Sequence, residues 1–162
     1  MEIVQFDKSL FDQVQRIYGE GIATGIATFE TSIPDWDSWD SAHLNIGRLA
    51  TMNGDKMLGW ASLSGVTNRC VHQGVAEISI YVAAESRGKG VGKLLLQKLI
   101  DVSEENKIWT LQAGIFRENT ASQILHKKCG FREIGYREKI GQLNGVWKDN
   151  VLMERRSIVV GN

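Results

Sequence analysis

The six-residue run Arg87-Gly88-Lys89-Gly90-Val91-Gly92 constrains this chain more than any other feature. It follows an apolar stretch at residues 75–84 and precedes the apolar run at residues 94–96, so it lies between a predicted strand and a predicted helix. Three glycines at alternate positions let the backbone approach a ligand closely, and the first N–H groups of the helix are free to bind an anion. The run therefore predicts a phosphate-binding turn in a fold that alternates strands and helices.

Two common phosphate-binding motifs do not fit this run. A P-loop needs a glycine five positions before its Gly-Lys pair and a Ser or Thr directly after it, but these positions hold Arg87 and Leu94. The dinucleotide fingerprint G-x-G-x-x-G needs its third glycine one residue after Gly92, where the chain has Lys93. What remains is the pattern Arg-x-x-Gly-x-Gly, or a plain glycine-rich turn that only tightens the connection between a strand and a helix.

Length and composition indicate a single domain over residues 1–162, because 43% of the residues are hydrophobic and a chain of this size buries a sizeable core. The 19 basic and 19 acidic side chains give zero net charge, so no overall field favours nucleic acid or an anionic membrane. Cys70 and Cys129 lie far apart, and Glu2 and Asp7 occupy the region where a signal peptide needs an apolar segment. We therefore expect a reduced, cytoplasmic protein with a small-molecule partner and without nucleic-acid or membrane partners.

Hydrophobic periodicity predicts strands and helices along the whole chain. We expect strands at residues 2–6, 48–52, 57–66, 75–84, 108–115, 131–140 and 147–154. We expect helices at residues 9–18, 36–46, 91–103 and 119–128, with caps at Ser9 and Asn119 and a break after the first helix at Gly19, Gly21 and Gly25. The pair Asn53-Gly54 predicts a type I′ hairpin turn between the second and third strands. The expected order is β-α-α-β-β-β-α-β-α-β-β.

One predicted strand carries a lone carboxylate. Alternation in residues 75–82 puts Glu77, Ser79 and Tyr81 on one face and the apolar residues Ile78, Ile80 and Val82 on the other. Such a carboxylate is either an exposed residue on the open face of the sheet or a base in a cleft.

A polar stripe runs along the predicted helix after the fifth strand. Asn119, Ser122 and His126 are spaced three and four residues apart, and the apolar Ile124 and Leu125 fall on the opposite side. The stripe predicts either a ligand-binding face or the solvated face of a capped helix.

These motifs resemble those of the GNAT family of acetyl-CoA-dependent N-acetyltransferases. Arg87-x-x-Gly90-x-Gly92 is similar to the family signature Gln/Arg-x-x-Gly-x-Gly/Ala, and the segment from Asn119 to Phe131 is similar to the family pattern Asn-x-x-Ala/Ser…Leu-Tyr-x-x-x-Gly-Phe. The resemblance implies an α/β (α+β) GNAT fold, with a mixed, mostly antiparallel sheet of about seven strands, about four flanking helices, and splayed strands at the acetyl-CoA site.

The resemblance also implies roles for individual residues. Backbone N–H groups of the glycine turn bind the pyrophosphate of acetyl-CoA, and an N–H near Val82 stabilises the oxyanion. Glu77 corresponds to the acidic base, whereas His126 stands where the family usually has the Tyr that protonates the CoA thiolate. An imidazole with a pKa of about 6.5 donates a proton more readily than a phenol at about 10, provided that it is protonated. The implied acetyl-CoA contacts are Ile80, Tyr81, Val82, Arg87, Gly88, Lys89, Gly90, Val91, Gly92, Lys93, Asn119 and Ser122.

Segments across nearly the whole chain look like the phosphinothricin or methionine sulfoximine N-acetyltransferase branch of this family. They are residues 27–31, 34–40, 69–82 and 145–156. The branch implies a homodimer and a small amino-acid-like acceptor, and the implied acceptor contacts are Phe29, Arg69, Cys70, Val71, His72 and Glu77. The branch commonly has Arg-Pro-Ala-Tyr where this chain has residues 69–72, which leaves substrate choice open. The aromatic side chains Phe29, Trp36, Trp39 and Trp147 are expected to pack in a core or a dimer interface rather than to contact a ligand.

The predicted activity is direct transfer of an acetyl group from acetyl-CoA to the α-amine of a small amino-acid-like substrate. No metal is expected, because His43, His72 and His126 lack the spacing of metal ligands. No covalent enzyme intermediate is expected, because Cys129 lacks an activating partner. Two alternatives stay open: an enzyme that acetylates a protein N-terminus or another amine, and a CoA-binding sensor without catalysis.

Overall fold

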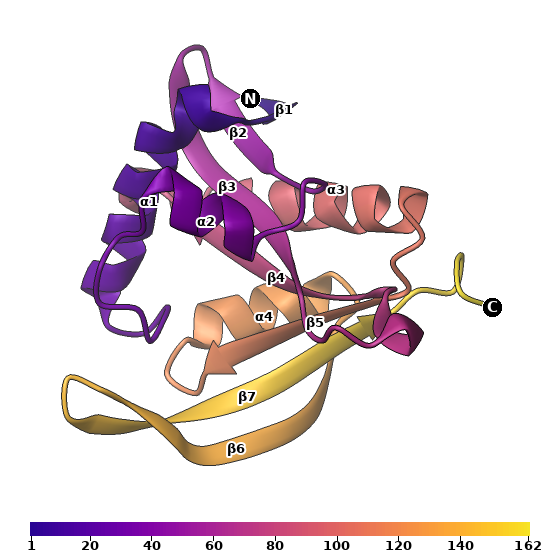
Figure 1. Cartoon of the computed structure of the whole chain (residues 1–162). Helices are drawn as coiled ribbons and strands as arrows, with labels where there is room; N and C mark the ends of the chain where they lie inside the picture. The colour runs from indigo at the N-terminus through magenta and orange to yellow at the C-terminus, as the bar shows by residue number, and fades with distance from the viewer.

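The computed structural model describes all residues from 1 to 162 as one seven-stranded sheet with helices on both faces (Figure 1). The strands are β1 (Glu2–Gln5), β2 (Leu49–Asn53), β3 (Lys56–Gly65), β4 (Val75–Val82), β5 (Thr110–Phe116), β6 (Arg132–Leu143) and β7 (Val146–Arg156). The helices are α1 (Phe11–Thr24), α2 (Trp36–Ala42), α3 (Val91–Glu105) and α4 (Thr120–Lys128), with short 3-10 helices at Lys8–Leu10, Cys70–His72 and Ala84–Ser86. The expected order of strands and α-helices is confirmed.

The sheet is mixed and mostly antiparallel, as predicted. Its strand order is β1-β2-β3-β4-β5-β7-β6, and only the pairing of β4 with β5 is parallel. A parallel pair needs a crossover, and α3 supplies it between β4 and β5. The sequence therefore places a strand, the glycine turn and a helix in direct succession at the centre of the sheet.

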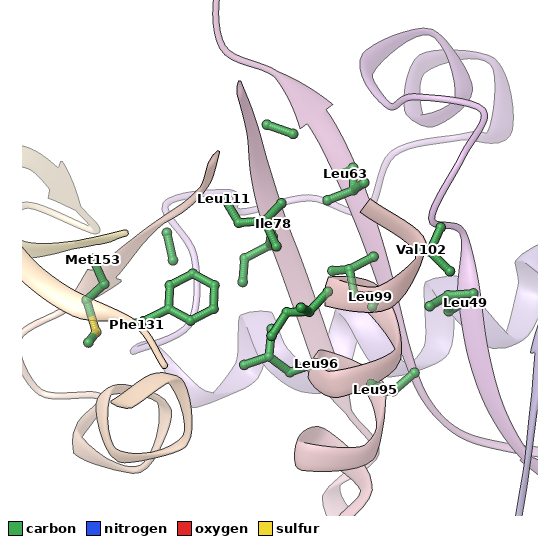
Figure 2. Close-up of a cluster of buried hydrophobic side chains, with 14 of the residues drawn as sticks. Leu49, Leu63, Ile78, Leu95, Leu96, Leu99, Val102, Leu111, Phe131 and Met153 are labelled. Atoms are coloured by element: carbon green, nitrogen blue, oxygen red, sulfur yellow. The ribbon is translucent and has the colours of Figure 1, made fainter. Parts of the chain in front are cut away.

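Alternate residues of the central strands point into two separate hydrophobic clusters. On one face, α3 packs Leu95 and Leu99 against Leu63 and Ile78 in a cluster of 18 buried residues (Figure 2). On the other face, Trp60 of β3 belongs to a cluster of 10 buried residues that α1 and α2 complete. The two-residue period of the strands separates these clusters, so both faces of the central sheet are covered.

Helix α1 is longer than predicted, because Gly19 and Gly21 lie inside it rather than ending it. A Cβ at Gly21 would lie 2.7 Å from a ring carbon of Tyr81, so this glycine lets the helix pack closely on the tyrosine of β4. The helix ends at Gly25, whose φ of 71° is left-handed. The predicted cap at Ser9 is also wrong: Asp7 accepts the capping hydrogen bond, and α1 begins at Phe11 after a 3-10 turn.

The β2–β3 hairpin is confirmed, but its turn type is not the predicted one. Asn53 pairs with Lys56, so Gly54 and Asp55 form the two-residue loop. Gly54 has a φ of 60°, whereas Asn53 and Asp55 have negative φ angles. A positive φ at only the first central position is typical of a type II′ turn, not of type I′.

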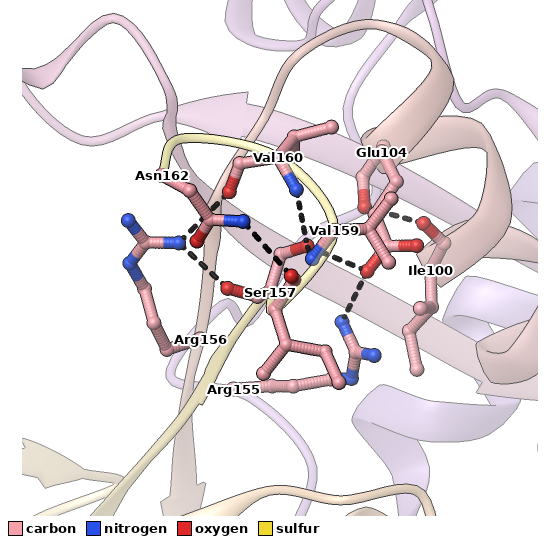
Figure 3. A network of polar contacts seen from close by, with 10 residues as sticks. Ile100, Glu104, Arg155, Arg156, Ser157, Val159, Val160 and Asn162 are labelled. Atoms are coloured by element: carbon pink, nitrogen blue, oxygen red, sulfur yellow. Dashed lines mark hydrogen bonds and ion pairs between the residues drawn. The ribbon is translucent and has the colours of Figure 1, made fainter.

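A polar network attaches the C-terminal segment to α3 (Figure 3). The Oε1 atom of Glu104 accepts hydrogen bonds from Arg155 at 3.0 Å and from the Ser157 hydroxyl at 2.8 Å. Arg156 donates to the backbone carbonyls of Val160 and Gly161. These bonds hold the end of β7 against the crossover helix and so support the parallel centre of the sheet.

None of the four helices has the length and apolar content needed to cross a membrane.

The strands β4 and β5 pair at only three positions and then separate, as the predicted splay requires. The paired positions are Val75 with Thr110, Ala76 with Leu111 and Glu77 with Gln112. Beyond them, residues 78–82 of β4 and 113–116 of β5 have no partner across this gap, and Figure 1 shows the two strands moving apart toward their C-terminal ends. The backbone of the second half of β4 is therefore free to bind a ligand on this side.

Candidate active site

Two cavities meet where β4 and β5 separate. We call the first the glycine cleft; it has a volume of about 550 Å³ and lies between the turn at residues 86–93 and helix α4. We call the second the central cavity; it has a volume of about 750 Å³ and extends from β4 and β5 to α2 and the loop after α1. Six residues line both: Ala27, Ile80, Tyr81, Asn119, Ser122 and His126. A ligand in one cavity can therefore reach a ligand in the other.

The glycine cleft contains the predicted anion-binding turn. Gly88 and Gly90 have φ angles of 75° and 84°, a left-handed conformation that glycine adopts without strain. The first intrahelical bond of α3 joins the N–H of Leu94 to the carbonyl of Gly90, so the preceding N–H groups are free to bind an anion. Gly92 instead lets α3 and α4 pack closely, because a Cβ at this position would lie 3.1 Å from Leu125 of α4.

Eleven of the twelve predicted acetyl-CoA contacts line the glycine cleft, the exception being Lys89. Lys128 and Ile124, which the sequence did not single out for this role, also line it. Ile124 and Leu125 were expected on the side of α4 away from a ligand, but both line the cleft: Ile124 is 48% exposed, and Leu125 also packs against the core.

Glu77 lies on β4 at the last position that pairs with β5. It shares a face with Ser79 and Tyr81, as alternation predicted, and all three line the central cavity. Glu77 is exposed, and no hydrogen bond or ion pair within the chain engages its carboxylate. The separation of the strands thus leaves a free carboxylate at the head of the cavity.

His126 is only 4% exposed, although the helix pattern predicted a polar stripe. Its Nδ1 atom lies 2.6 Å from the Ser122 carbonyl and must donate to it, so the neutral ring keeps Nε2 as an acceptor. Burial lowers the pKa of His126, and the ring packs edge-on against Phe131. The imidazole is therefore neutral at pH 7, which changes the expected role of a protonated donor.

Tyr81 stands at the junction of the two cavities. Its ring lies 4.9 Å from those of Tyr18 and Trp60, between α1 and β3. Burial raises the pKa of Tyr81 far above its ordinary value, and the neighbouring Tyr18 adds to the shift. The phenol hence keeps its proton over the whole working range of pH and can donate a hydrogen bond at this point.

Comparison with known proteins agrees with this geometry. Residues 15–131 match the family described as the acetyltransferase (GNAT) family. The chain belongs to the GNAT family.

Characterised relatives and solved structures narrow the relationship. The chain is 35% identical to phosphinothricin N-acetyltransferase of Alcaligenes faecalis, over 88% of this chain and 75% of that protein. It is 28% identical to the L-methionine sulfoximine/L-methionine sulfone acetyltransferase of Salmonella typhimurium, over 91% and 90% of the two chains. A GNAT superfamily phosphinothricin acetyltransferase of Sinorhizobium meliloti, solved in complex with acetyl-CoA, superposes with a TM-score of 0.87 at 25% identity, over 96% and 87% of the chains. This GNAT protein is an N-acetyltransferase.

The glycine cleft of this GNAT enzyme has the chemistry that a nucleotide-bearing thioester needs. Arg87, Lys93 and Lys128 supply positive charge at a turn with free backbone N–H groups. The unpaired edge of β4 offers backbone donors and acceptors to an extended arm. Nowhere in the chain do three His, Cys, Asp or Glu side chains gather as metal ligands.

The predicted acceptor contacts fall into two groups. Phe29 and Glu77 line the central cavity, where the Phe29 ring packs edge-on against Phe116 at 4.6 Å between centroids. The predicted contacts at residues 69–72 lie instead on the exposed segment between β3 and β4, and none of them lines either cavity. Sequence order places this segment directly before Glu77, but the chain turns away from the cavity there.

The sequence did not predict that α2 and the residue after it form one wall of the central cavity. His43 stacks on Trp39 with ring centroids 4.1 Å apart, and both line the central cavity. The buried Arg48 donates to the Asp40 carboxylate at 2.6 Å and to the backbone carbonyls of Leu44 and His43, and its guanidinium lies over the Trp39 ring. The only sequence signal for this wall is the four-residue spacing of Trp39 and His43, which many surface helices share.

Proposed function

We propose that this enzyme transfers the acetyl group of acetyl-CoA directly to the α-amine of a small amino-acid-like substrate of the methionine sulfoximine, methionine sulfone or phosphinothricin type. The observation that carries this proposal is the junction of the two cavities at Tyr81 and His126. A donor in the glycine cleft and an amine in the central cavity meet there, which is the proximity that direct transfer requires. The substrates named for the relatives supply the acceptor class.

In this proposal the acetyl-CoA pyrophosphate binds the N–H groups at residues 88–93, and the pantetheine arm pairs with the free edge of β4 at residues 80–82. Asn119 also caps α4, since its Oδ1 accepts from the Ser122 N–H at 3.2 Å. Its amide nitrogen is left to donate to the arm. The thioester carbonyl then lies at the junction, where a backbone N–H of β4 stabilises the developing oxyanion.

Glu77 is the proposed general base. An α-ammonium must lose a proton before its nitrogen attacks the thioester carbonyl, and a free carboxylate at the head of the cavity can take it directly or through a water. Removal of this proton makes the lone pair available, and the new C–N bond forms. The nitrogen then sheds a second proton to become the neutral amide, and the C–S bond breaks to release the CoA thiolate.

His126 is the proposed proton donor to the thiolate, with one change from the sequence-based prediction. Because its resting form is neutral with Nε2 open, His126 must first take up a proton on Nε2, the one that the acceptor nitrogen sheds after attack, before it delivers one to sulfur. Tyr81 is the competing donor, since its phenol stays protonated and also lines both cavities. Comparing His126→Gln with Tyr81→Phe separates them: the true donor is the one whose loss lowers kcat with little change in the KM of either substrate.

We further propose that the enzyme is a cytoplasmic homodimer. Both cysteines are free thiols. The hairpin of β6 and β7 exposes apolar side chains that a second copy would cover; they are Ile134, Tyr136, Ile140, Val146 and Trp147. Light scattering of the purified protein tests the assembly, and a monomer at micromolar concentration would contradict it.

Free-thiol release from acetyl-CoA tests the proposed activity. The acceptor panel is methionine sulfoximine, methionine sulfone, phosphinothricin, ordinary amino acids and a peptide with a free N-terminus. We expect turnover with at least one of the first three. Turnover with the peptide alone would instead favour acetylation of protein N-termini, and tight CoA binding without any turnover would favour a sensor.

A further inference from the structure

The two cavities carry opposite charge. Glu30 and Glu77 line the central cavity, and none of its lining residues is a lysine or an arginine. The glycine cleft has Arg87, Lys93 and Lys128 and no carboxylate. A cationic site for the donor phosphates therefore adjoins an anionic site for the acceptor.

The two histidines of the central cavity do not offset its negative charge. Burial lowers the pKa of both His43 and His126, so both rings are neutral at pH 7. In each, Nδ1 donates to the backbone carbonyl four residues earlier, that of Trp39 at 2.7 Å and that of Ser122 at 2.6 Å. Each Nε2 is then a hydrogen-bond acceptor, so the titratable side chains with which one copy of the chain lines the central cavity are negative or neutral.

Glu30 is held at the cavity on a fixed loop. Its backbone N–H donates to the Thr28 hydroxyl at 3.1 Å, and the preceding Phe29 packs against Phe116. A Cβ at Gly141 of β6 would lie 3.1 Å from the Phe29 ring, so the loop also packs tightly on the β6–β7 hairpin. No ion pair or hydrogen bond within the chain engages the Glu30 carboxylate. Its charge is thus available to act on the ligand.

We infer that Glu30 selects among amino-acid-like acceptors by charge and favours an uncharged side-chain head group over an anionic one. This inference rests on the proposed function. The sulfone of methionine sulfone is neutral, whereas the phosphinate of phosphinothricin is an anion at neutral pH. Both molecules carry the same α-amine and α-carboxylate, so their comparison isolates the head group. An anionic head group in a cavity with two unpaired carboxylates is repelled by both of them.

The test is the ratio of kcat/KM for L-methionine sulfone to that for L-phosphinothricin, measured by free-thiol release at low ionic strength. We expect the wild-type enzyme to prefer the sulfone by about tenfold or more, since like charges placed together in a binding site cost several kcal/mol. Glu30→Gln should reduce this preference about fivefold, mainly because the KM for phosphinothricin falls when one negative charge is removed. Glu30→Lys should reduce the preference further. Added salt should narrow the preference of the wild type more than that of Glu30→Gln.

Glu105→Gln is the matched control, because this exposed carboxylate at the end of α3 lines neither cavity. Its ratio should equal that of the wild type. A wild-type enzyme that uses phosphinothricin as well as the sulfone, or a ratio that neither Glu30 variant moves, would overturn the inference and leave the proposed function standing. Absence of turnover with both acceptors, despite acetyl-CoA binding, would overturn the proposed function and this inference with it.

Discussion

The glycine cleft and the central cavity adjoin, yet they are built in different ways. The anion-binding turn of the glycine cleft depends on backbone: positive φ angles at Gly88 and Gly90 and free N–H groups at the start of α3, all within a few consecutive residues. The central cavity depends on side chains from α1, the following loop, α2, β3, β4, β5, α4 and β7. A backbone site keeps its ligand while neighbouring side chains change, whereas one substitution in a side-chain site can change the ligand.

Glu77→Gln should have the largest effect, because it removes the proposed base while keeping the shape of the central cavity. We expect kcat to fall by roughly 10²-fold or more, with the Kd for CoA unchanged. Steady-state kinetics and calorimetric CoA titration measure the two effects, and Glu133→Gln on β6 is an exposed control. Near-normal kcat across the pH range would remove Glu77 from this role.

Gly90→Val tests the backbone site. Valine avoids the φ of 84° that Gly90 adopts, so the turn must shift and misalign its N–H donors. Losing one charge-assisted hydrogen bond of about 2 kcal/mol weakens CoA binding by about tenfold or more, which titration calorimetry would detect.

Gly145→Val is the matched control for Gly90→Val. Gly145 has a φ of 80° in the β6–β7 turn and, like Gly90, no atom within 4 Å of an added Cβ. The two variants therefore share the backbone strain, but only the change at Gly90 should weaken CoA binding. Equal Kd values for both variants would contradict the backbone-built cleft.

Arg48→Ala should disturb the central cavity from a distance. Loss of the guanidinium removes the bonds to Asp40 and His43, so the α2 wall should loosen and the KM for the acceptor should rise about fivefold, with the KM for acetyl-CoA unchanged. We also expect a stability loss of about 2 kcal/mol, measured by urea unfolding. Arg132→Ala, which breaks an exposed pair with Glu154, should change neither. Equal changes in both KM values would show that α2 does not act on the acceptor alone.

The smallest expected effect is on stability near neutral pH. Burial lowers the pKa of His43 and His126 in the folded state below the ordinary value of about 6.5. Between the lowered pKa and the ordinary one, the unfolded chain therefore binds more protons than the folded chain. Stability should therefore rise with pH through this window and fall on acidification, by at most about 1.4 kcal/mol per histidine per pH unit. Urea unfolding at pH 7.5, 6.5 and 5.5 measures this slope.

Variants at two histidines test the origin of this slope. His126→Gln should flatten the slope, because the variant no longer takes up this proton on unfolding. His72→Asn is the control, because it removes an exposed histidine on the segment before β4 without touching either buried ring. An unaltered slope in His126→Gln would mean that its buried neutral state does not limit stability.

Local features of the site could be predicted from the sequence. The glycine turn, the Asn119 cap and the side of β4 that carries Glu77 each depend on a few neighbouring residues, and all three lie as expected. The order of strands and helices followed from hydrophobic periodicity for the same reason.

The errors arose where distant segments decide the outcome. The sequence predicted that Gly19 and Gly21 end the first helix, but both lie inside it. They allow close packing, because Ile33 occupies the space of a side chain at Gly19 and Tyr81 that of a side chain at Gly21. His126 read as part of a solvated or ligand-facing stripe, yet packing against Phe131 buries it and sets its tautomer through the Ser122 carbonyl.

The sequence by itself determined the family resemblance, the order of elements and the glycine turn before α3, since these depend on short-range conformational preferences. Tertiary structure alone decided which side chains line the central cavity: it brought Glu30, His43 and Trp39 to the same cavity as Glu77 and left residues 69–72 outside it. The physical reason is that a side chain's exposure, charge state and partners depend on contacts between segments far apart in the chain, and the separation of β4 from β5 creates the space in which those segments meet.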